Sequence, residues 1–342
     1  MSTEYDAILL LSFGGPEGPD EVMPFLERVV AGRPVPRERL VGVSKHYLTM
    51  GGVSPINARV RELIASLESA LAEKGPALPV YWGNRFWHPL LEDTVKKMRD
   101  DGRKRVLCVV TSAYSSWSGC RAYWRDIERA REAVPGAPVI DRVRTYFNHP
   151  GFVETCIDRV REGLNMLGED ASEATVLFSA HSIPNGMAAA CDYVEQLEEV
   201  ARLCTEALSL SRTQIVYQSR SGPPRVPWLE PDVGDAIRGL AEARPGSAVL
   251  VAPIGFVADH MEVVWDLDTE ARGIAEECGL TFARAPAANV HPAYVEALRD
   301  LVEERVSGRA ERPTVGRLPA RPDTCRPGCC PDGRPARPLP RA

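Results

Sequence analysis

Residues 247–278 read SAVLVAPIGFVADHMEVVWDLDTEARGIAEEC. The stretch begins with a short apolar run at 247–253, which is typical of a buried β-strand. After a loop, residues 262–278 have the periodicity of an amphipathic helix. A buried strand followed by a helix is half of a βαβ unit, from which parallel sheets are built. Because the same order recurs along the chain, the sequence predicts an α/β fold.

Seven further apolar runs predict strands, at 7–13, 80–85, 105–110, 138–142, 174–179, 213–218 and 280–284. Helical patterns lie between them at 90–101, 119–132, 151–167 and 262–278. Eight strands could form one sheet, but the count divides evenly about Pro150. We therefore expect two similar domains, 1–150 and 151–308, each with a four-stranded parallel sheet flanked by helices. The last helix of the second domain is a candidate to pack back on the first.

Residues 309–342 are rich in Pro, Arg and Cys and have no periodic apolar face. Such a tail cannot fold by burial alone, so it needs another anchor. The whole chain has a formal net charge of -6, which argues against a nucleic-acid partner. Its N-terminal apolar run follows acidic residues and is far shorter than the ~20 residues of a membrane span. We expect a cytoplasmic monomer with no membrane span.

The segment FSAHSIP, at 178–184, places His181 directly after a predicted strand. A lone histidine is more often a structural residue than a functional one. In open parallel sheets, however, ligands bind beyond the carboxyl ends of the strands, and this position favours a functional role. With an unperturbed pKa of about 6.5, a histidine there can accept a proton or hold a metal near neutrality.

Three carboxylates, Glu262, Asp266 and Glu270, are spaced four residues apart in the predicted helix 262–278. At about 100° per residue, this spacing places them along one stripe of an α-helix. A solvated acidic face is the simpler interpretation, but the helix has a separate apolar face and begins after a strand end. A row of oxygen ligands about 12 Å long is a path along which a divalent cation can enter and shed water. Crowding of like charges would also raise the pKa of one carboxyl group and make it a proton acceptor.

Six segments together resemble the ferrochelatase family, and the resemblance covers nearly the whole chain. They are LSFGGPEG at 11–18, GGVSPINA at 51–58, NRFWHPLLED at 84–93, FSAHSIP at 178–184, YQSRSGPPRVPWLEPD at 217–232 and GFVADHMEVVWDLDTEA at 255–271. The pair SAHSxP and DHxExxxxxD is the most specific part. The resemblance implies a chelatase-like fold with the porphyrin in a cleft between two domains. It also implies a lyase of haem biosynthesis that inserts Fe²⁺ as its substrate.

Carried over by position, His181 matches the family's essential histidine and Glu262 its catalytic glutamate. Asp266 and Glu270 match the acidic row behind that glutamate, so these four residues form the implied metal-handling set. Porphyrin contacts are expected in the matching stretches, from Phe13, Arg85, Tyr123 and Trp228. Several relatives have a tyrosine where this chain has Phe13. No phenolate can therefore bind iron at this position, and His181 is the expected alternative ligand.

The chain has nine cysteines and no export signal, which favours reduced thiols. Three of them, Cys325, Cys329 and Cys330, lie within six residues of the tail. Four thiolates can hold either a 2Fe–2S cluster or zinc. The pattern resembles cluster-bearing ferrochelatases, including those of actinobacteria, in which one internal cysteine joins three from the tail. This resemblance implies a 2Fe–2S cluster with Cys156 as the internal ligand.

The same subtype implies coproporphyrin III as the substrate instead of protoporphyrin IX. Independently, residues 17–50 should border the cleft and carry both charge signs, which suits an aqueous mouth better than a lipid-facing one. Coproporphyrin has four propionates to protoporphyrin's two, and so offers more anionic groups to arginines. The candidate arginines are Arg28, Arg33, Arg37 and Arg39, and the alternative is that they are ordinary solvated surface.

Three other functions remain open on the sequence: a protoporphyrin IX ferrochelatase, a non-catalytic haem or iron carrier on the same scaffold, and a chelatase for another metal such as cobalt. A carrier needs no proton acceptor, so the joint presence of His181 and the acidic row argues against it. The SAHSIP and VADHMEV segments favour iron. The expected partners are the porphyrin, Fe²⁺ and a downstream haem-pathway enzyme that receives the product transiently.

Overall fold

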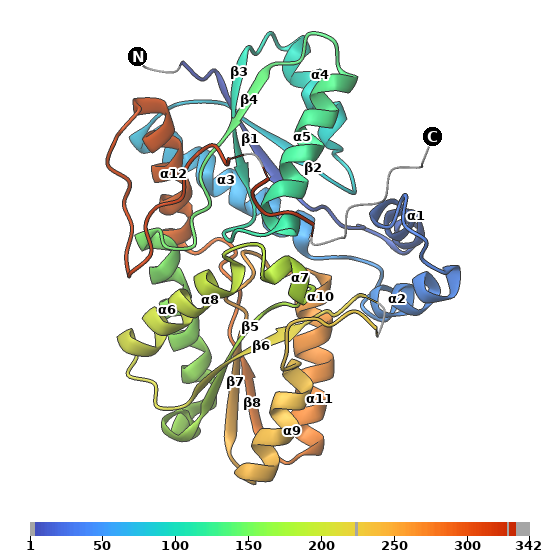
Figure 1. Cartoon of the computed structure of the whole chain (residues 1–342), viewed down its shortest axis with the longest axis vertical. Helices are drawn as coiled ribbons and strands as arrows, with labels where there is room; N and C mark the ends of the chain where they lie inside the picture. The colour runs from blue at the N-terminus through green and yellow to red at the C-terminus, as the bar shows by residue number, and fades with distance from the viewer. Residues whose placement is uncertain (1–3, 223–224, 327, 333–342) are drawn as a thin grey trace.

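The computed structural model describes residues 4–222, 225–326 and 328–332. Parts of the loop 217–232 and of the tail 309–342, namely 223–224, 327 and 333–342, lie outside the described residues. The chain forms two α/β halves, each built on one parallel sheet, and the halves lie one above the other in Figure 1.

The first sheet has the order β2-β1-β3-β4, with all strands parallel. Its strands are β1 (Ala7–Ser12), β2 (Val80–Asn84), β3 (Arg105–Val110) and β4 (Val139–Arg142). Every residue of β1 is buried, as expected for a central strand with both faces covered. Helix α3 (Ile56–Lys74) packs on one face, and α4 (Leu91–Asp100) and α5 (Ala122–Ala133) pack on the other.

The second sheet repeats this topology in the order β6-β5-β7-β8. Its strands are β5 (Thr175–His181), β6 (Thr213–Gln218), β7 (Ala248–Ala252) and β8 (Thr281–Arg284). Helices α6 (Pro150–Leu167) and α8 (Tyr193–Ala207) cover one face, while α9 (Val233–Ala243) and α11 (Arg272–Glu277) cover the other. The predicted fold of two four-stranded parallel sheets flanked by helices is therefore confirmed.

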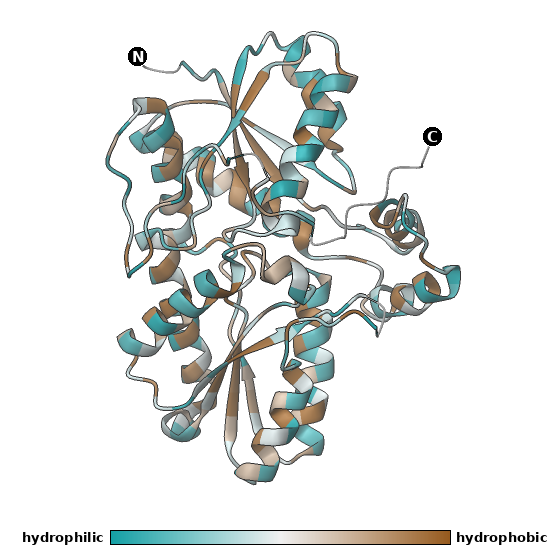
Figure 2. Ribbon diagram, viewed as in Figure 1, coloured by the Kyte–Doolittle hydropathy of each residue, from teal (hydrophilic) through white to brown (hydrophobic). Residues whose placement is uncertain are grey.

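The last helix, α12 (Pro292–Ser307), packs against both α6 and α3, and so lies against the helices of both sheets. Figure 2 shows much of the strands of both sheets in brown, the colour of hydrophobic residues. One continuous hydrophobic cluster runs from the first sheet through α12 into the second. Near the level where the two halves join, α1 (Pro19–Val29) and α2 (Arg37–Thr49) form a pair that projects to one side.

The described part of the tail is anchored by polar contacts and forms no helix or strand of its own between 309 and 332. Asn148 makes three hydrogen bonds to it: its carbonyl accepts from the Val315 N–H at 2.9 Å, and its Nδ2 donates to the Leu318 and Pro319 carbonyls at 2.7 and 3.2 Å. On α12, Arg305 Nη1 donates to Asp323 at 2.9 Å. The backbone N–H of Arg317 donates to Glu199 of α8. The tail therefore bridges elements of both halves of the molecule.

Candidate active site

The carboxyl ends of the two sheets meet where the halves of the molecule join (Figure 1). The Tyr114 hydroxyl, in the loop after β3, donates to the Ile254 carbonyl in the loop after β7 at 2.8 Å. The adjacent Ser115 exchanges two hydrogen bonds with Gln196 of α8, at 2.8 and 2.9 Å. Because strand-end loops of parallel sheets collect ligand-binding groups, this junction is the expected place for a site.

His181 is the last residue of β5, and its Nε2 lies 3.7 Å from Oε2 of Glu262. Its other ring nitrogen, Nδ1, lies 2.5 Å from the Ser182 carbonyl oxygen. Since a carbonyl can only accept, Nδ1 carries the hydrogen, and a neutral His181 keeps a free lone pair on Nε2. Both side chains are part-exposed, at 34% and 52%. The pair can accept a proton on Nε2 and stabilise the resulting imidazolium with the Glu262 carboxylate.

Glu262 lies at the start of a helix whose winding the sequence did not predict. The helix begins as α10 (Met261–Val263), continues as the π-helix η3 (Val264–Ala271) and ends as α11. A π-helix bonds residue i to i+5, so one turn takes more residues than in an α-helix, and such segments often occur at functional sites. Residues four apart still share one side, and the charges of Glu262 and Glu270 both act on Asp266.

Asp266 is the most perturbed carboxyl group of this row. Burial is the main reason that its pKa is raised to about 7, and the neighbouring charges of Glu262 and Glu270 act in the same direction. Hydrogen bonds from the Ser219 hydroxyl and from Gln218 Nε2, the latter at 3.3 Å, act in the opposite direction. Like-charge crowding was the expected cause of a raised pKa, but burial is the larger one. A carboxyl group poised near neutrality can take up or release a proton.

The structure brings the pair His181–Glu262 and the row Glu262–Asp266–Glu270 to one place, but not as a coordination cage. Within 4–222, 225–326 and 328–332, no group of three or more His, Cys, Asp or Glu side chains is arranged to hold a metal ion. Glu270 accepts a hydrogen bond from Trp265 Nε1 at 2.8 Å, and His46 of α2 stacks on that indole ring at 4.3 Å. Helix α2 therefore contacts the acidic helix directly.

Three of the four predicted porphyrin contacts already have partners within the protein. Arg85 Nε donates to Asp126 at 2.6 Å, and its guanidinium lies 4.4 Å from the centre of the Tyr123 ring. Tyr123 is buried in the core between the first sheet and α5. Phe13 is partly exposed and packs on Phe86 at 4.7 Å between ring centres. The role of these residues in binding a porphyrin stays a prediction.

The fourth, Trp228, lies beside the His181 loop, because it forms an isolated bridge with Pro184. The next residue, Leu229, donates its N–H to the Ile183 carbonyl at 3.0 Å. The indole is 9% exposed, and its buried Nε1 has no hydrogen-bond partner among the described residues. Of the four predicted contacts, Trp228 is therefore the one next to His181 with a free donor.

The structure does not bring Cys156, the predicted internal thiol ligand, together with the tail cysteines. Cys156 faces the core on α6, where burial raises its pKa, and it does not line the cavity formed by the tail cysteines. That cavity contains Cys120 instead, together with Cys325, Cys329 and Cys330. Cys120 lies in the segment SSWSGCRAY, in the helix Trp117–Arg121 that follows the loop after β3.

The four thiols share a small, partly buried space. Cys329 Sγ and Cys330 Sγ are 3.5 Å apart, and Arg142 donates to Cys120 Sγ at 3.4 Å and to Cys325 Sγ at 3.8 Å. A hydrogen bond from the Cys120 thiol lowers the pKa of Cys325 to about 7. The Arg142 guanidinium supplies positive charge where several thiolates would otherwise repel one another.

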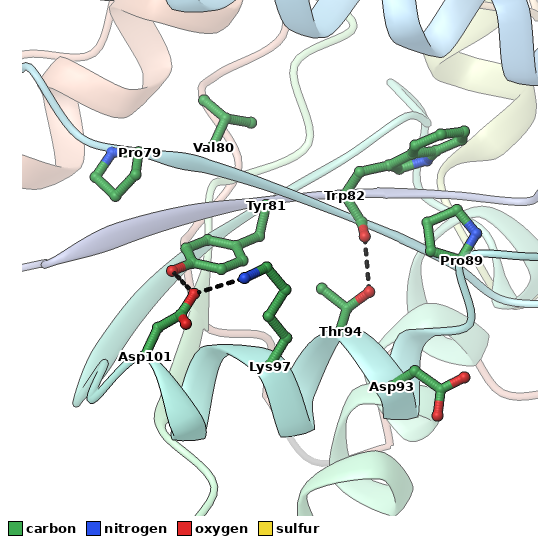
Figure 3. Close-up of a pocket in the computed structure, with 9 residues that line it drawn as sticks. All are labelled: Pro79, Val80, Tyr81, Trp82, Pro89, Asp93, Thr94, Lys97 and Asp101. Atoms are coloured by element: carbon green, nitrogen blue, oxygen red, sulfur yellow. Dashed lines mark hydrogen bonds and ion pairs between the residues drawn. The ribbon is translucent and has the colours of Figure 1, made fainter.

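A separate cavity of about 540 Å³ lies between the edge strand β2 and α4 (Figure 3). Its polar groups satisfy one another: the Tyr81 hydroxyl and Lys97 both bond to Asp101, at 2.7 and 3.0 Å. None of the predicted site residues lines it. We therefore place the candidate active site at His181 and Glu262 and not in this larger cavity.

The comparisons with known proteins show the family of the chain. A ferrochelatase family model matches residues 5–306, which include the whole site. The chain belongs to the ferrochelatase family. The ferrochelatase of Rhodopirellula baltica is 50% identical over 95% of this chain and 93% of its own length. The coproporphyrin III ferrochelatase of Nocardia farcinica is 48% identical over 97% of this chain and 98% of its own length, and that of Mycolicibacterium smegmatis is 50% identical over 91% and 93%.

Two solved structures have the same fold as this chain, although their sequence identity to it is much lower. SirB from Bacillus subtilis with Fe³⁺ is 13% identical, with a TM-score of 0.55 over 89% of this chain and 97% of its own. CbiX, described as the terminal enzyme of sirohaem biosynthesis in denitrifying bacteria, is 14% identical, with a TM-score of 0.50 over 87% and 98%. The predicted chelatase-like fold is thus confirmed. Across the described residues, no helix has both the length and the hydropathy needed to cross a bilayer.

Proposed function

We propose that this chain inserts Fe²⁺ into coproporphyrin III in haem biosynthesis, forming Fe-coproporphyrin III and releasing two protons. The observation that carries the proposal is near-full-length identity of 47–50% to proteins named coproporphyrin III ferrochelatases. The His181–Glu262 pair supports the chemistry. We also propose a cytoplasmic monomer that hands its product to the next enzyme of the pathway.

Metal insertion requires both pyrrole protons of the porphyrin to leave as iron enters. His181 Nε2 has the free lone pair to accept a proton, and Glu262, 3.7 Å away, compensates the resulting charge. The oxygen row continuing through Asp266 and Glu270 suits a hard divalent cation that exchanges its water for carboxylates. Contacts distant from the reacting nitrogens can supply the strain, about 1–5 kcal/mol, that bends the macrocycle and exposes its lone pairs.

The surface of α2, the helix that contacts the acidic helix, carries both charged and apolar side chains. Arg37 of α2 pairs with Glu27 at 3.2 Å while remaining 72% exposed, so its charge stays accessible to solvent. On α2 and the turn after it, four apolar side chains are also exposed: Val41, Leu48, Met50 and Val53. The expectation of an aqueous mouth rested on charge alone and missed these residues. The arginines supply cations for propionates, and we propose that they favour the tetra-anionic porphyrin.

We predict that coproporphyrin III is preferred over protoporphyrin IX in kcat/KM by roughly tenfold or more, the equivalent of one charge-assisted contact of about 1.4 kcal/mol. The measurement is steady-state anaerobic insertion of Fe²⁺ into each porphyrin in detergent-free buffer, with an octyl glucoside series to control for porphyrin aggregation. Equal or better use of protoporphyrin IX in both series would overturn the substrate assignment while leaving iron insertion intact.

We further propose a 2Fe–2S cluster held by Cys120, Cys325, Cys329 and Cys330. The fit rests on the donor set, since four thiols line one cavity and Arg142 offsets their charge. A bound cluster would supply redox-active iron and a covalent cross-link from the tail to the start of α5. These residues would hold the tail against the first sheet. Zinc is the alternative, because the same donors suit it.

For the cluster, we expect the purified protein to be brown, with about two irons per chain. Cys120→Ser should reduce iron and acid-labile sulfide to near zero, and it should lower the Tm by loosening the tail. Substitution of the buried Cys156 by serine is the matched control, and this variant should keep both its iron and its sulfide. Metal analysis, sulfide assay and visible absorption test this together. One zinc with no sulfide would contradict the cluster, and loss of iron from Cys156→Ser alone would contradict the ligand set.

A further inference from the structure

Two carboxylates that are not members of the acidic row lie close to it in the sequence. Asp259 lies three residues before Glu262, and Asp268 lies two residues after Asp266. Both bond to one side chain, Arg284. Its Nη1 donates to Asp259 Oδ1 at 2.8 Å, its Nε donates to Asp268 Oδ1 at 2.9 Å, and its Nη2 donates to Asp268 Oδ2 at 2.6 Å. One guanidinium therefore ties the loop before Glu262 to the π-helix that carries Asp266.

Arg284 is well placed to act as a fixed point. It is the last residue of β8, in register with Val251 of β7, and its side chain is only 13% exposed. The following N–H, of Ala285, donates to the Val251 carbonyl at 2.9 Å. The planar guanidinium makes a two-pronged contact with Asp268 that a lysine cannot reproduce. The clamp is thus mounted on the sheet and not on a mobile surface element.

Asp259 is held from the other side by Asn289. Asn289 Nδ2 donates to Asp259 Oδ2 at 2.7 Å, and the Asp259 N–H donates to Asn289 Oδ1 at 2.9 Å. The backbone N–H of Asn289 donates to the Val257 carbonyl at 2.9 Å, and its φ of 49° is one that asparagine tolerates well. Both oxygens of Asp259 are therefore occupied, which fixes the loop from which Glu262 extends.

We propose that Arg284 is a positioning residue for iron insertion. It acts through Asp259 and Asp268 to hold Glu262 at its distance from His181 and to hold the π-helical turn that places Asp266 against Ser219. This inference rests on the proposed function. The hydrogen bonds of Arg284 go to Asp259, Asp268 and the Ala285 carbonyl and not to His181 or Glu262. Losing Arg284 should therefore misplace the carboxylates of the row without removing any of them. A misplacement of about 1 Å can lower a rate about 100-fold.

The test measures kcat and KM for anaerobic iron insertion, with bound porphyrin counted by fluorescence titration. Arg284→Met should lower kcat about 100-fold with the porphyrin stoichiometry and KM near parental values. Arg284→Lys should recover part of kcat, because it restores a charge but not the fork. Arg272→Met is the matched control. The Arg272 guanidinium, on α11, lies 5.0 Å from the centre of the Phe282 ring on β8, and it should be dispensable for turnover.

Asp268→Asn provides an independent variant should Arg284→Met fail to fold, and it should show the same loss of turnover per bound porphyrin. The double variant should lose little more than either single one, since both break one contact. Parental kcat in folded Arg284→Met or in Asp268→Asn, or an equal loss in Arg272→Met, would overturn the inference. Failure of the proposed function is a different result, because the unmodified protein would then insert no iron.

Discussion

Replacing His181 by alanine is expected to abolish iron insertion while leaving the protein folded. General acid–base groups contribute about 10²–10⁴-fold to rate, so residual turnover should fall by at least that factor. The reason is local: Nδ1 is bonded to the Ser182 carbonyl, which leaves Nε2 as the free base beside Glu262. The side chain is 34% exposed at a strand end, so its removal creates no core cavity.

The measurement is anaerobic Fe²⁺ insertion by His181→Ala, followed in the porphyrin spectrum, beside a thermal unfolding curve of the same sample. The matched control is His88→Ala, which removes a histidine on the first sheet's side of the molecule, in the loop after β2. Near-parental turnover in His181→Ala would contradict the central role of this residue. A collapse of the melting curve would mean that His181 supports the fold instead.

Changing Glu262 to glutamine is expected to have the second-largest effect, a loss of most activity, of about 10²-fold or more. Glutamine keeps the shape of the side chain but cannot compensate a proton on His181 Nε2, 3.7 Å away, nor offer a charged ligand to iron. Because the Glu262 side chain is 52% exposed, the substitution should change the free energy of unfolding by less than about 0.5 kcal/mol.

Glu276→Gln is the matched control, since Glu276 is an exposed carboxylate on the continuation of the same helix in α11. Steady-state kinetics of Glu262→Gln, Asp266→Asn and Glu276→Gln then show how much each carboxylate contributes to turnover. We expect Glu262→Gln to be the most severe and Glu276→Gln to be silent. A silent Glu262→Gln with a severe Asp266→Asn would show that the wrong member of the row had been assigned as the partner of His181.

The fold was predictable because its signals are local. Each strand is a short apolar run followed by a polar loop, and burial on both faces makes the central strands β1 and β7 continuously apolar. The even division of the strands gave two sheets. The winding of η3 was not predictable, because carboxylates four residues apart share one side in both an α- and a π-helix. Spacing alone therefore does not distinguish the two.

The sequence predicted the proximity of candidate residues that follow strand ends, but not the contacts that long-range packing decides. His181 and Glu262 satisfied the strand-end rule, and they lie together. The internal thiol was chosen by resemblance, but Cys156 lies in the core and Cys120 lies beside the tail cysteines. The clamp of Arg284 on Asp259 and Asp268 joins residues up to 25 positions apart. Asp259 and Asp268 are the two aspartates of the DHxExxxxxD motif, but nothing in that motif identifies Arg284 as their partner.

The most direct test of iron insertion at His181 is anaerobic mixing of the purified protein with excess Fe²⁺ and coproporphyrin III, followed by the free-base porphyrin spectrum. We predict conversion of many porphyrins per protein molecule to Fe-coproporphyrin III, and no conversion above the uncatalysed rate with His181→Ala. Binding of the porphyrin or of its iron complex at one per chain, with no metallation beyond the uncatalysed rate, would contradict the account and indicate a carrier.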